Sequence, residues 1–486
     1  MKNFFGRIRQ LTAEAEDTSV EQLKLNTRTL SIWEGNLWAL MWGLGESYIG
    51  PYALFLGAGN MVMAFLGTAP VFITSIAQLV GSGLIDRVGR RMPIILGGIA
   101  LQSAVWLPLF ALPLLLPSGG VIALAACAAL YFAIAGIVVP SWMSLIGDVV
   151  EPAARGQYFA NRSRLVMYGM VVALLLAGII TNAWKGIGLT AVGFGLVFGI
   201  AALARTTSIA FMRRHYDAPL EPCTPNDRYS FWSFLGATEN RNYARFTFAV
   251  ALMSGTTNIA GPFFAVYMLR DLQWSYLLFT INTLTFMLAQ TFFVRWWGSI
   301  GDRHGNRSVL LATGSLLPIL PLFWVFSANY FVLLFAQVVS GAIWSGFNLA
   351  AANFIYDSVP QNRRARAVSY YSLINGLFSV IGAMGIGAWL ATHTPSELHL
   401  GTVHLALSSP LPVVFVISAI TRAIAAAIML PQFREVREVE PISTARILYR
   451  LGIGQPLFGQ VNVFSPRLRA IAAYNRKNSA PQPTSD

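Results

Sequence analysis

Charged residues are scarce in this chain of 486 residues. They make up 11% of it, whereas 55% of the residues are hydrophobic and the mean hydropathy is +0.57. A soluble protein carries about 25% charged residues, because its surface must be covered by groups that water solvates. The scarcity of charge excludes a soluble enzyme and a disordered chain of this length. It favours a protein whose surface faces the acyl chains of a bilayer.

Cysteine is scarcer still. Cys127 lies in an apolar run and Cys223 in a polar segment, so the pair forms no spaced set for a disulfide framework or a zinc site. The five histidines have no metal-ligand spacing. The sequence also has no phosphate-binding loop and no cluster of polar catalytic residues. We therefore expect no enzymatic activity, no cofactor and no metal site.

Long apolar runs are abundant. A membrane-spanning helix needs about 20 mostly apolar residues. Twelve such runs are predicted, at 33 to 57, 60 to 84, 92 to 116, 121 to 147, 164 to 183, 187 to 211, 244 to 269, 274 to 300, 307 to 327, 330 to 356, 368 to 391 and 410 to 432. The expected fold class is therefore an all-α integral membrane protein with two groups of six transmembrane helices. The first bundle covers 33–211, a polar linker covers 212–243, and the second bundle covers 244–432.

Basic residues are distributed unevenly between the two sides of these spans. The termini and every second loop, with the residues at the span ends beside them, hold 29 of the 34 lysine and arginine residues, and only Lys185 and Arg270 lie in loops on the other side. Because cytoplasmic loops carry an excess of lysine and arginine, we expect a multi-pass protein of the plasma (inner) membrane with both termini in the cytoplasm. The net charge of +13 is then an orientation signal, and nucleic-acid binding is not expected. Arg205, Arg295 and Arg422 lie within spans and are expected to extend toward the nearer interface.

The flanking segments are predicted to lie on the cytoplasmic side. In residues 1–32, Phe4, Phe5, Ile8 and Leu11 fall on one face of a helix, which is typical of an amphipathic helix lying on the membrane surface. The tail 433–486 is basic with scattered apolar residues, and a protein partner is a hypothesis for it.

The two halves of the sequence repeat short motifs in the same order. Three pairs are separated by 211, 216 and 208 residues: Gly50-Pro51-Tyr52 with Gly261-Pro262-Phe263, Asp-Arg-x-Gly-Arg-Arg at 86–91 with Asp-Arg-x-Gly-Asn-Arg at 302–307, and Pro152-x-x-Arg155 with Pro360-x-x-Arg363. A weaker fourth pair joins Arg205 to Arg422. Matches in one order at similar separations indicate a duplicated six-helix unit.

Segments 82–91 and 298–307 resemble the loop signature of the major facilitator superfamily, Gly-x-x-x-Asp-Arg-x-Gly-Arg-Arg. The first copy has Ser82 in place of the glycine, and the second has Asn306 in place of the first of the paired arginines. With twelve spans in two groups of six, the resemblance covers nearly the whole chain. It implies that the two bundles rock about a central site near the bilayer midplane, lined by spans one, four, seven and ten.

The resemblance also implies a role for the motif residues as a conformational latch. Carboxylates and arginines at helix ends can pair across the bundles in only one of two states. The alternative is that these loops only fix the topology. The latch candidates are Asp86, Arg87, Gly89, Arg90, Arg91, Asp148, Arg155, Asp302, Arg303, Gly305, Arg307, Asp357 and Arg363.

Glu46 is the one carboxylate predicted to lie well inside a span. A stripe at i+4 spacing joins it to Trp38, Trp42 and Gly50, and Pro51 predicts a kink that frees backbone groups. A charged group at this depth costs about 2.5–3.5 kcal/mol, so it indicates function by default. Glu46 then carries a coupling proton or binds a cationic substrate. The alternative is a protonated glutamic acid hydrogen-bonded between helices.

The remaining residues expected around the central site are neutral and often aromatic. The repeat places Thr257 opposite Glu46. The candidates for the wall of the site are Trp42, Tyr131, Trp142, Thr257, Asn258, Gln337, Trp344 and Asn348. No lysine or arginine lies in the middle of spans one, four, seven or ten, which disfavours phosphorylated and dicarboxylate substrates.

The function predicted from the sequence is secondary active transport of a small organic solute that is uncharged, amphipathic or cationic. Transport would proceed by alternating access, as symport or antiport, and proton coupling through Glu46 is a hypothesis. The alternative function is that of a sensor or structural subunit of a membrane complex that resembles a transporter but does not transport.

Overall fold

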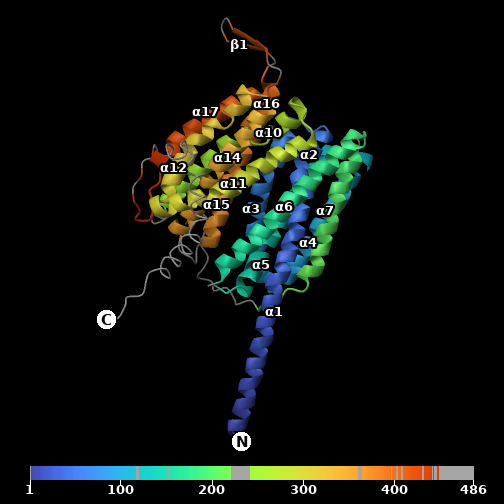
Figure 1. Cartoon of the computed structure of the whole chain (residues 1–486), viewed down its shortest axis with the longest axis vertical. Helices are drawn as coiled ribbons and strands as arrows, with labels where there is room; N and C mark the ends of the chain where they lie inside the picture. Colours follow the sequence, from blue (N-terminus) through green and yellow to red (C-terminus); the bar gives the residue numbers. More distant parts are fainter. Residues whose placement is uncertain are drawn as a thin grey trace, which may run out of the picture.

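The computed structural model describes residues 2–115, 120–151, 154–219, 241–359, 364–395, 397–400, 403–406, 409–429, 432–440, 442 and 446–447. Nearly all of this part is helical. The exception in regular structure is an antiparallel hairpin of β1 (Glu397–Leu400) and β2 (Val403–Ala406). The hairpin projects from one end of the helical bundle, which we call the hairpin end (Figure 1). The opposite end carries the two Asp-Arg motifs and is called the motif end.

The helices follow the order expected from the apolar runs. The first half contains α1 (Lys2–Leu44), η1 (Glu46–Tyr48), α2 (Ile49–Phe55), α3 (Asn60–Val88), α4 (Met92–Leu115), α5 (Gly120–Val149), α6 (Arg155–Gly186) and α7 (Thr190–Met212). The second half contains α9 (Arg241–Asn258), α10 (Phe263–Val266), η4 (Tyr267–Asp271), α11 (Tyr276–His304), α12 (Asn306–Leu316), η5 (Leu317–Ile319), α13 (Leu322–Phe326), α14 (Tyr330–Ser358), α15 (Arg364–Val380), η7 (Ile381–Gly387), α16 (Ala388–His393) and α17 (Leu411–Met429).

Eleven helical segments of the described residues are long and apolar enough to cross a membrane. They correspond to spans two to twelve of the sequence prediction. The first span is built from α1, η1 and α2. It is less apolar because it carries Glu34 and Glu46 together with several tryptophan and tyrosine residues.

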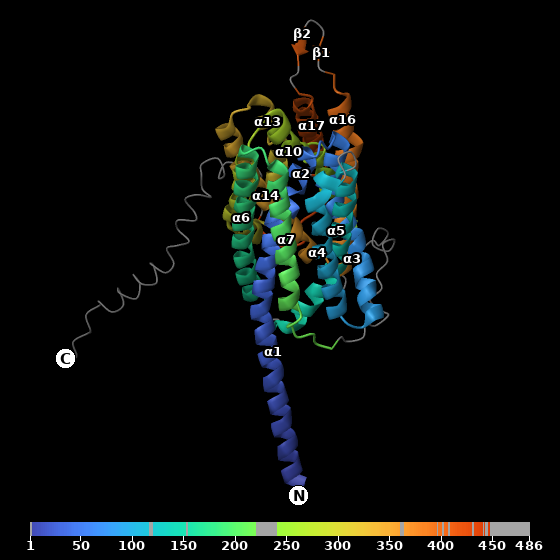
Figure 2. The ribbon, with the colours of Figure 1, turned by 90° about the vertical axis from the view of Figure 1, so that its right-hand side faces the viewer.

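The N-terminal segment is helical, as expected, and is continuous with the first span. Its backbone is the beginning of α1, which runs without interruption from Lys2 to Leu44. The helix extends well beyond the motif end along its own axis (Figures 1 and 2). The helix therefore joins directly onto the first span, and the position of residues 1–32 on the membrane surface stays a prediction.

The two halves meet along two pairs of helices. Across the boundary, α3 packs on α15 and α6 packs on α11. Both contacts need glycine, because a methyl group at Gly178 of α6 would lie 2.6 Å from the hydroxyl of Thr280 on α11, and one at Gly376 of α15 would lie 2.8 Å from the Cα of Phe72 on α3. Small residues at such crossings let helix backbones approach closely, which is the usual source of helix association in membranes.

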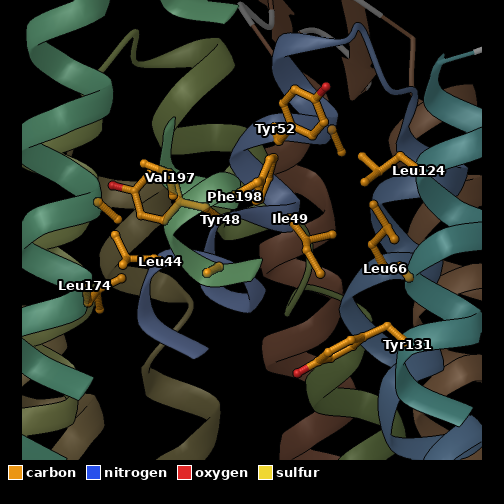
Figure 3. Close-up of a cluster of buried hydrophobic side chains, with 14 of the residues drawn as sticks. Leu44, Tyr48, Ile49, Tyr52, Leu66, Leu124, Tyr131, Leu174, Val197 and Phe198 are labelled. Carbon is orange, nitrogen blue, oxygen red and sulfur yellow. The ribbon is translucent and has the colours of Figure 1, made fainter. Parts of the chain in front are cut away.

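Buried apolar residues form two main clusters. One lies within the first half and continues into the second half near the hairpin end. Figure 3 shows part of it, with Tyr48 near Val197 and Phe198 of α7, and Tyr131 on α5. The other lies within the second half and includes Phe433, which the sequence placed in the tail.

Candidate functional site

The first span is interrupted close to its Gly-Pro pair. Helix α1 ends at Leu44, and Glu46–Tyr48 forms one tight turn before α2 begins. Pro51 has no N–H to donate to the carbonyl of Ser47, and its ring crowds that carbonyl, so a regular helix cannot continue through this point. The predicted kink is therefore present. The helix breaks at Gly45, so the predicted i+4 stripe does not continue as a regular helix through Glu46, although Trp42 still contributes a side-chain hydrogen bond to Glu46.

The seventh span is interrupted at the equivalent place. Helix α9 ends at Asn258, four residues before Pro262, and α10 begins at the residue after this proline. The same proline chemistry thus breaks one helix in each half. Broken helices at corresponding positions of two repeats are a structural pointer to a binding site, because the freed backbone groups need polar partners.

The carboxylate of Glu46 meets a tyrosine of the fourth span. The hydroxyl of Tyr131 donates to Oε2 of Glu46 over 2.9 Å. Tyr131 is 2% exposed, whereas Glu46 is half-buried. The indole of Trp106 packs on the Tyr131 ring with centroids 5.1 Å apart, and its N–H has no hydrogen-bond partner in the described part of the chain. The ion pairs found among the described residues do not include Glu46.

Neutral groups hold the equivalent break in the seventh span. The carbonyl of Thr257 accepts a hydrogen bond from Nη2 of Arg422 over 3.2 Å, and the Thr257 hydroxyl has no partner among the described residues. The amide of Asn258 donates to the Ser254 carbonyl over 2.8 Å and to the Ser379 hydroxyl over 3.1 Å. The side chains of the first break therefore include an acid, whereas those of the second are hydroxyl and amide groups, and the guanidinium of Arg422 binds its backbone.

A buried ionic network in the first bundle was missed by the sequence reasoning. Glu34 is 4% exposed, and its Oε1 lies 3.2 Å from Nη1 of Arg205. Arg205 also donates to Oε1 of Gln102 over 2.9 and 2.7 Å. Glu46 is thus not the only carboxylate inside the bundle. Arg205 and Arg422 are 4% and 2% exposed and bond within their bundles, so the expectation that they extend to the interface is wrong. The occurrence of an arginine at equivalent positions of both halves was the sequence signal that could have indicated a buried role for Arg205 and Arg422.

A second arginine faces Glu34. Nη2 of Arg162 lies 3.7 Å from Oε2 of Glu34, so two guanidinium groups share one carboxylate. The Arg162 guanidinium also lies over the ring of Trp142, 4.5 Å from its centroid. No basic residue belongs to the middle of span four, but the structure brings one from span five onto the wall candidate Trp142.

The candidates on the tenth span make contacts within the second bundle. Nε2 of Gln337 donates to Oδ1 of Asn282 on α11 over 2.7 Å. Trp344 is half-buried and meets Phe347 edge to face, with centroids 5.6 Å apart. Asn348 is exposed, and Trp42 on the first span is half-buried. The structure therefore brings Glu46 together with Tyr131 and Trp42, and leaves the candidates of the tenth span on a neighbouring helix.

At the motif end of the first bundle, Arg91 is the centre of the contacts. It is fully buried, with Nη1 2.6 Å from Oδ2 of Asp148 and Nε 3.3 Å from Oδ1 of Asp217. Asp217 also accepts a hydrogen bond from the backbone N–H of Met92 at the start of α4. Gly89 ends α3 with a φ of +66°, a left-handed conformation that glycine adopts without strain.

The motif end of the second bundle uses the segment that follows α17. Asp357 accepts a hydrogen bond from Nδ2 of Asn306 over 2.7 Å and lies 3.2 Å from Nε of Arg437. Nε of Arg303 lies 2.8 Å from Oε2 of Glu440. The hydrogen bond and charge of Arg303 hold the pKa of Glu440 below its ordinary value. Arg437 thus supplies a cation to Asp357, as Arg91 does to Asp148.

Four latch candidates, Arg91, Asp148, Arg303 and Asp357, form ion pairs, and each pair lies within one half of the chain. Arg87, Arg90 and Asp302 are exposed. Arg155 and Arg307 donate hydrogen bonds to backbone carbonyls. Gly305 has a positive φ and forms the turn before α12. The side chain of Asp86 and residue Arg363 lie outside the described part of the chain.

Polar contacts between the two bundles lie toward the hairpin end and, for the Thr291 hydroxyl and the Met167 sulfur 3.0 Å apart, near the middle of α11 and α6. The hydroxyls of Tyr48 and Thr280 are 2.5 Å apart. Asn60 donates to the carbonyl of Ala391 over 2.9 Å and accepts from Nη1 of Arg270 over 3.2 Å. Asn60 therefore joins the start of α3 to the ends of two helical spans from the other half.

Comparison of the sequence with models of known protein families gives one family match. The family model described as Major Facilitator Superfamily matches residues 36–224 and 246–473. The match falls into two parts, and these correspond to the two repeats. A sequence comparison with curated proteins gives no significant match.

Solved transporter structures share the fold at low sequence identity. The nucleoside transporter NupG has a TM-score of 0.59 and 14% identity, over 85% of this chain and 99% of that one. A D-xylose-proton symporter has a TM-score of 0.59 and 14% identity, over 86% and 99% of the two chains. A bacterial homolog of the human lysosomal transporter Spinster, inward-facing and unoccupied, has a TM-score of 0.57 and 15% identity, over 85% and 96%.

Proposed function

Because the chain belongs to the major facilitator superfamily, a family of membrane transporters, we propose that it moves a small organic solute by alternating access of its two bundles. The observation that carries this proposal is the pair of broken helices at equivalent positions. The break in the first span presents a half-buried carboxylate, Glu46, held by one tyrosine. The break in the seventh presents neutral hydrogen-bonding groups.

We propose that Glu46 is the coupling or substrate-binding group. A carboxylate removed from water is costly unless it is paired, and here its hydrogen-bond partners are neutral, the hydroxyl of Tyr131 and the indole of Trp42. Binding a proton or a cationic group of the solute removes that cost, so the charge on Glu46 is tied to ligand occupancy. This change of charge can bias the equilibrium between two arrangements of the bundles, since a ligand shifts an equilibrium by its differential affinity for the two states.

The proposed solute is uncharged, amphipathic or cationic. Trp42, Trp142 and Trp344 are half-buried on spans one, four and ten and offer aromatic faces. The guanidinium of Arg162 already lies on Trp142 and faces Glu34. It therefore has a carboxylate partner within the protein, whereas Glu46 belongs to none of the ion pairs found among the described residues.

We infer that the motif end lies in the cytoplasm and that the plasma membrane is the site of action. The excess of lysine and arginine at the motif end supports this orientation. The polar contacts of Asn60 and Tyr48 join the bundles toward the hairpin end, whereas the motif residues bond within each bundle.

The second candidate function is a membrane subunit that resembles a transporter but does not transport. The docking of Arg437 and Glu440 onto the motif end of the second bundle is the observation that favours it, because the segment after α17 occupies residues expected to work in alternating access. Intact motif residues in both halves favour transport instead.

The test is a thermal-shift screen of the whole purified protein against a solute library at two pH values, with Glu46→Gln and with Glu151→Gln as the control for an exposed carboxylate. The proposal predicts a ligand whose affinity depends on pH in the wild type and in Glu151→Gln, but not in Glu46→Gln. The ligand is then assayed for uptake in liposomes. Binding that does not respond to pH or to Glu46→Gln contradicts the role of Glu46, and binding without uptake favours the second function.

A further inference from the structure

A cleft of about 430 Å³ lies on the side of the second bundle, near the motif end. Part of its wall is apolar and is formed by Phe248 and Leu252 of α9, Phe378 of α15 and Ile428 of α17. Ligand sites in proteins have volumes of about 300–1,000 Å³, so the cleft has room for part of an organic molecule. It is separate from Glu46, which lies on the first bundle.

The surface around the cleft is formed by exposed apolar side chains, as is typical of a surface in contact with lipid acyl chains. Phe248 and Ile428 on its wall are 43% and 46% exposed. Leu377 and Ile381 from α15 and η7, and Ile424 one turn before Ile428, are 43%, 51% and 53% exposed. A soluble protein would not leave so contiguous an apolar surface uncovered. In a membrane-spanning chain this surface meets the lipid.

Two arginines stand at the end of the cleft closest to the motif end. Arg241 and Arg245 are one turn apart at the start of α9, and both are exposed. Helix α9 is oriented by its other face, where Tyr243 and Phe246 are buried in the core. Within the described part of the chain, no carboxylate pairs with either arginine. A cleft with an apolar wall and a doubly cationic rim is complementary to a molecule with an acyl chain and an anionic head.

We propose that this cleft binds an anionic glycerophospholipid of the leaflet at the motif end. Its phosphate accepts hydrogen bonds from Arg241 and Arg245, and one acyl chain lies along Phe248, Phe378 and Ile428. Guanidinium groups suit a phosphate oxygen pair geometrically, and basic pockets between membrane helices bind anionic lipid heads. The site is independent of the proposed transport chemistry.

The experiment is native mass spectrometry of the whole detergent-purified protein titrated with phosphatidylglycerol, phosphatidylcholine or inorganic phosphate. Phosphatidylglycerol is expected to bind in preference to phosphatidylcholine. The double variant Arg241→Gln with Arg245→Gln is expected to weaken phosphatidylglycerol binding roughly 30-fold, from about 1 kcal/mol for each basic residue near a membrane surface. Arg241→Lys with Arg245→Lys retains the charge and should restore most of the binding.

The matched control removes two other exposed arginines at the same end, Arg213 and Arg214 after α7. Arg213→Gln with Arg214→Gln should bind phosphatidylglycerol as the wild type does. Equal loss in both double variants would mean attraction by net charge alone and would overturn the proposal. Equal binding of phosphatidylglycerol and phosphatidylcholine would also overturn the proposal. So would binding of inorganic phosphate as tight as that of phosphatidylglycerol. A single symmetrical size-exclusion peak for each variant separates loss of binding from loss of folding.

Discussion

The substitution Glu34→Gln tests the buried ionic network most directly. Glutamine has nearly the shape of glutamate but no charge, so Arg205 and Arg162 would remain in the first bundle without the carboxylate that they share. Removing one partner of a buried ion pair costs about 3–5 kcal/mol, because the remaining charge is uncompensated. For a unit the size of one six-helix bundle, 1 kcal/mol corresponds to roughly 2–4 °C in Tm. A fall of about 10 °C is therefore expected.

The assay is thermal unfolding of the purified protein followed by tryptophan fluorescence in one detergent. Glu151→Gln is the control, because Glu151 is exposed and its loss should change the stability by less than about 0.5 kcal/mol. The double variant Glu34→Gln with Arg205→Gln removes both charges of the closest pair. It should be destabilised by less than the sum of the two single variants. A melting temperature of Glu34→Gln equal to that of the control, or strict additivity in the double variant, would refute the reasoning.

Three further predictions concern other contacts. Arg422→Gln should destabilise the protein less than Arg205→Gln does in the same melting assay, because Arg422 bonds to carbonyls and a hydroxyl and its loss leaves no carboxylate unpaired. Asn60→Ala should weaken closure of the hairpin end, seen as faster hydrogen exchange of the residues around it, and unchanged exchange would contradict this. Glu440 has a lowered pKa, so its pairing with Arg303 is present at neutral pH and is lost as the pH falls through that lowered value. Proteolysis of the segment after α17 should increase on acidification, and Arg303→Gln should already show the increase at neutral pH.

The sequence predicted the architecture well because membrane spans are specified by length and apolarity alone. The break near Pro51 and the pairing of spans into two repeats were also accessible, since proline chemistry and repeated motifs are local signals. Glu46 was found because it stands inside an apolar run. Its partner Tyr131 was proposed only as one aromatic among several on the expected wall.

Partners distant in the sequence were beyond such reasoning. Glu34 stands near the predicted start of a span, where a carboxylate looks like an interface residue, and its burial depends on α6 and α7 packing beside α1. Arg205 looked free to extend for the same reason. The pairing of Arg437 with Asp357 depends on the chain turning back after α17, for which the sequence carries no periodic signal.

The aromatic contacts of Phe433 show that the packed core of the second bundle includes residues beyond the last membrane span. Phe433 is 0% exposed and lies against Phe246 and Phe354, with ring centroids 5.5 and 5.2 Å apart. Truncating a buried phenylalanine costs about 3–5 kcal/mol. A shortened protein ending at Gln432 would thus uncover a core that one ending after Ile447 keeps closed, so a truncation point, a fused tag or a reporter belongs beyond Ile447.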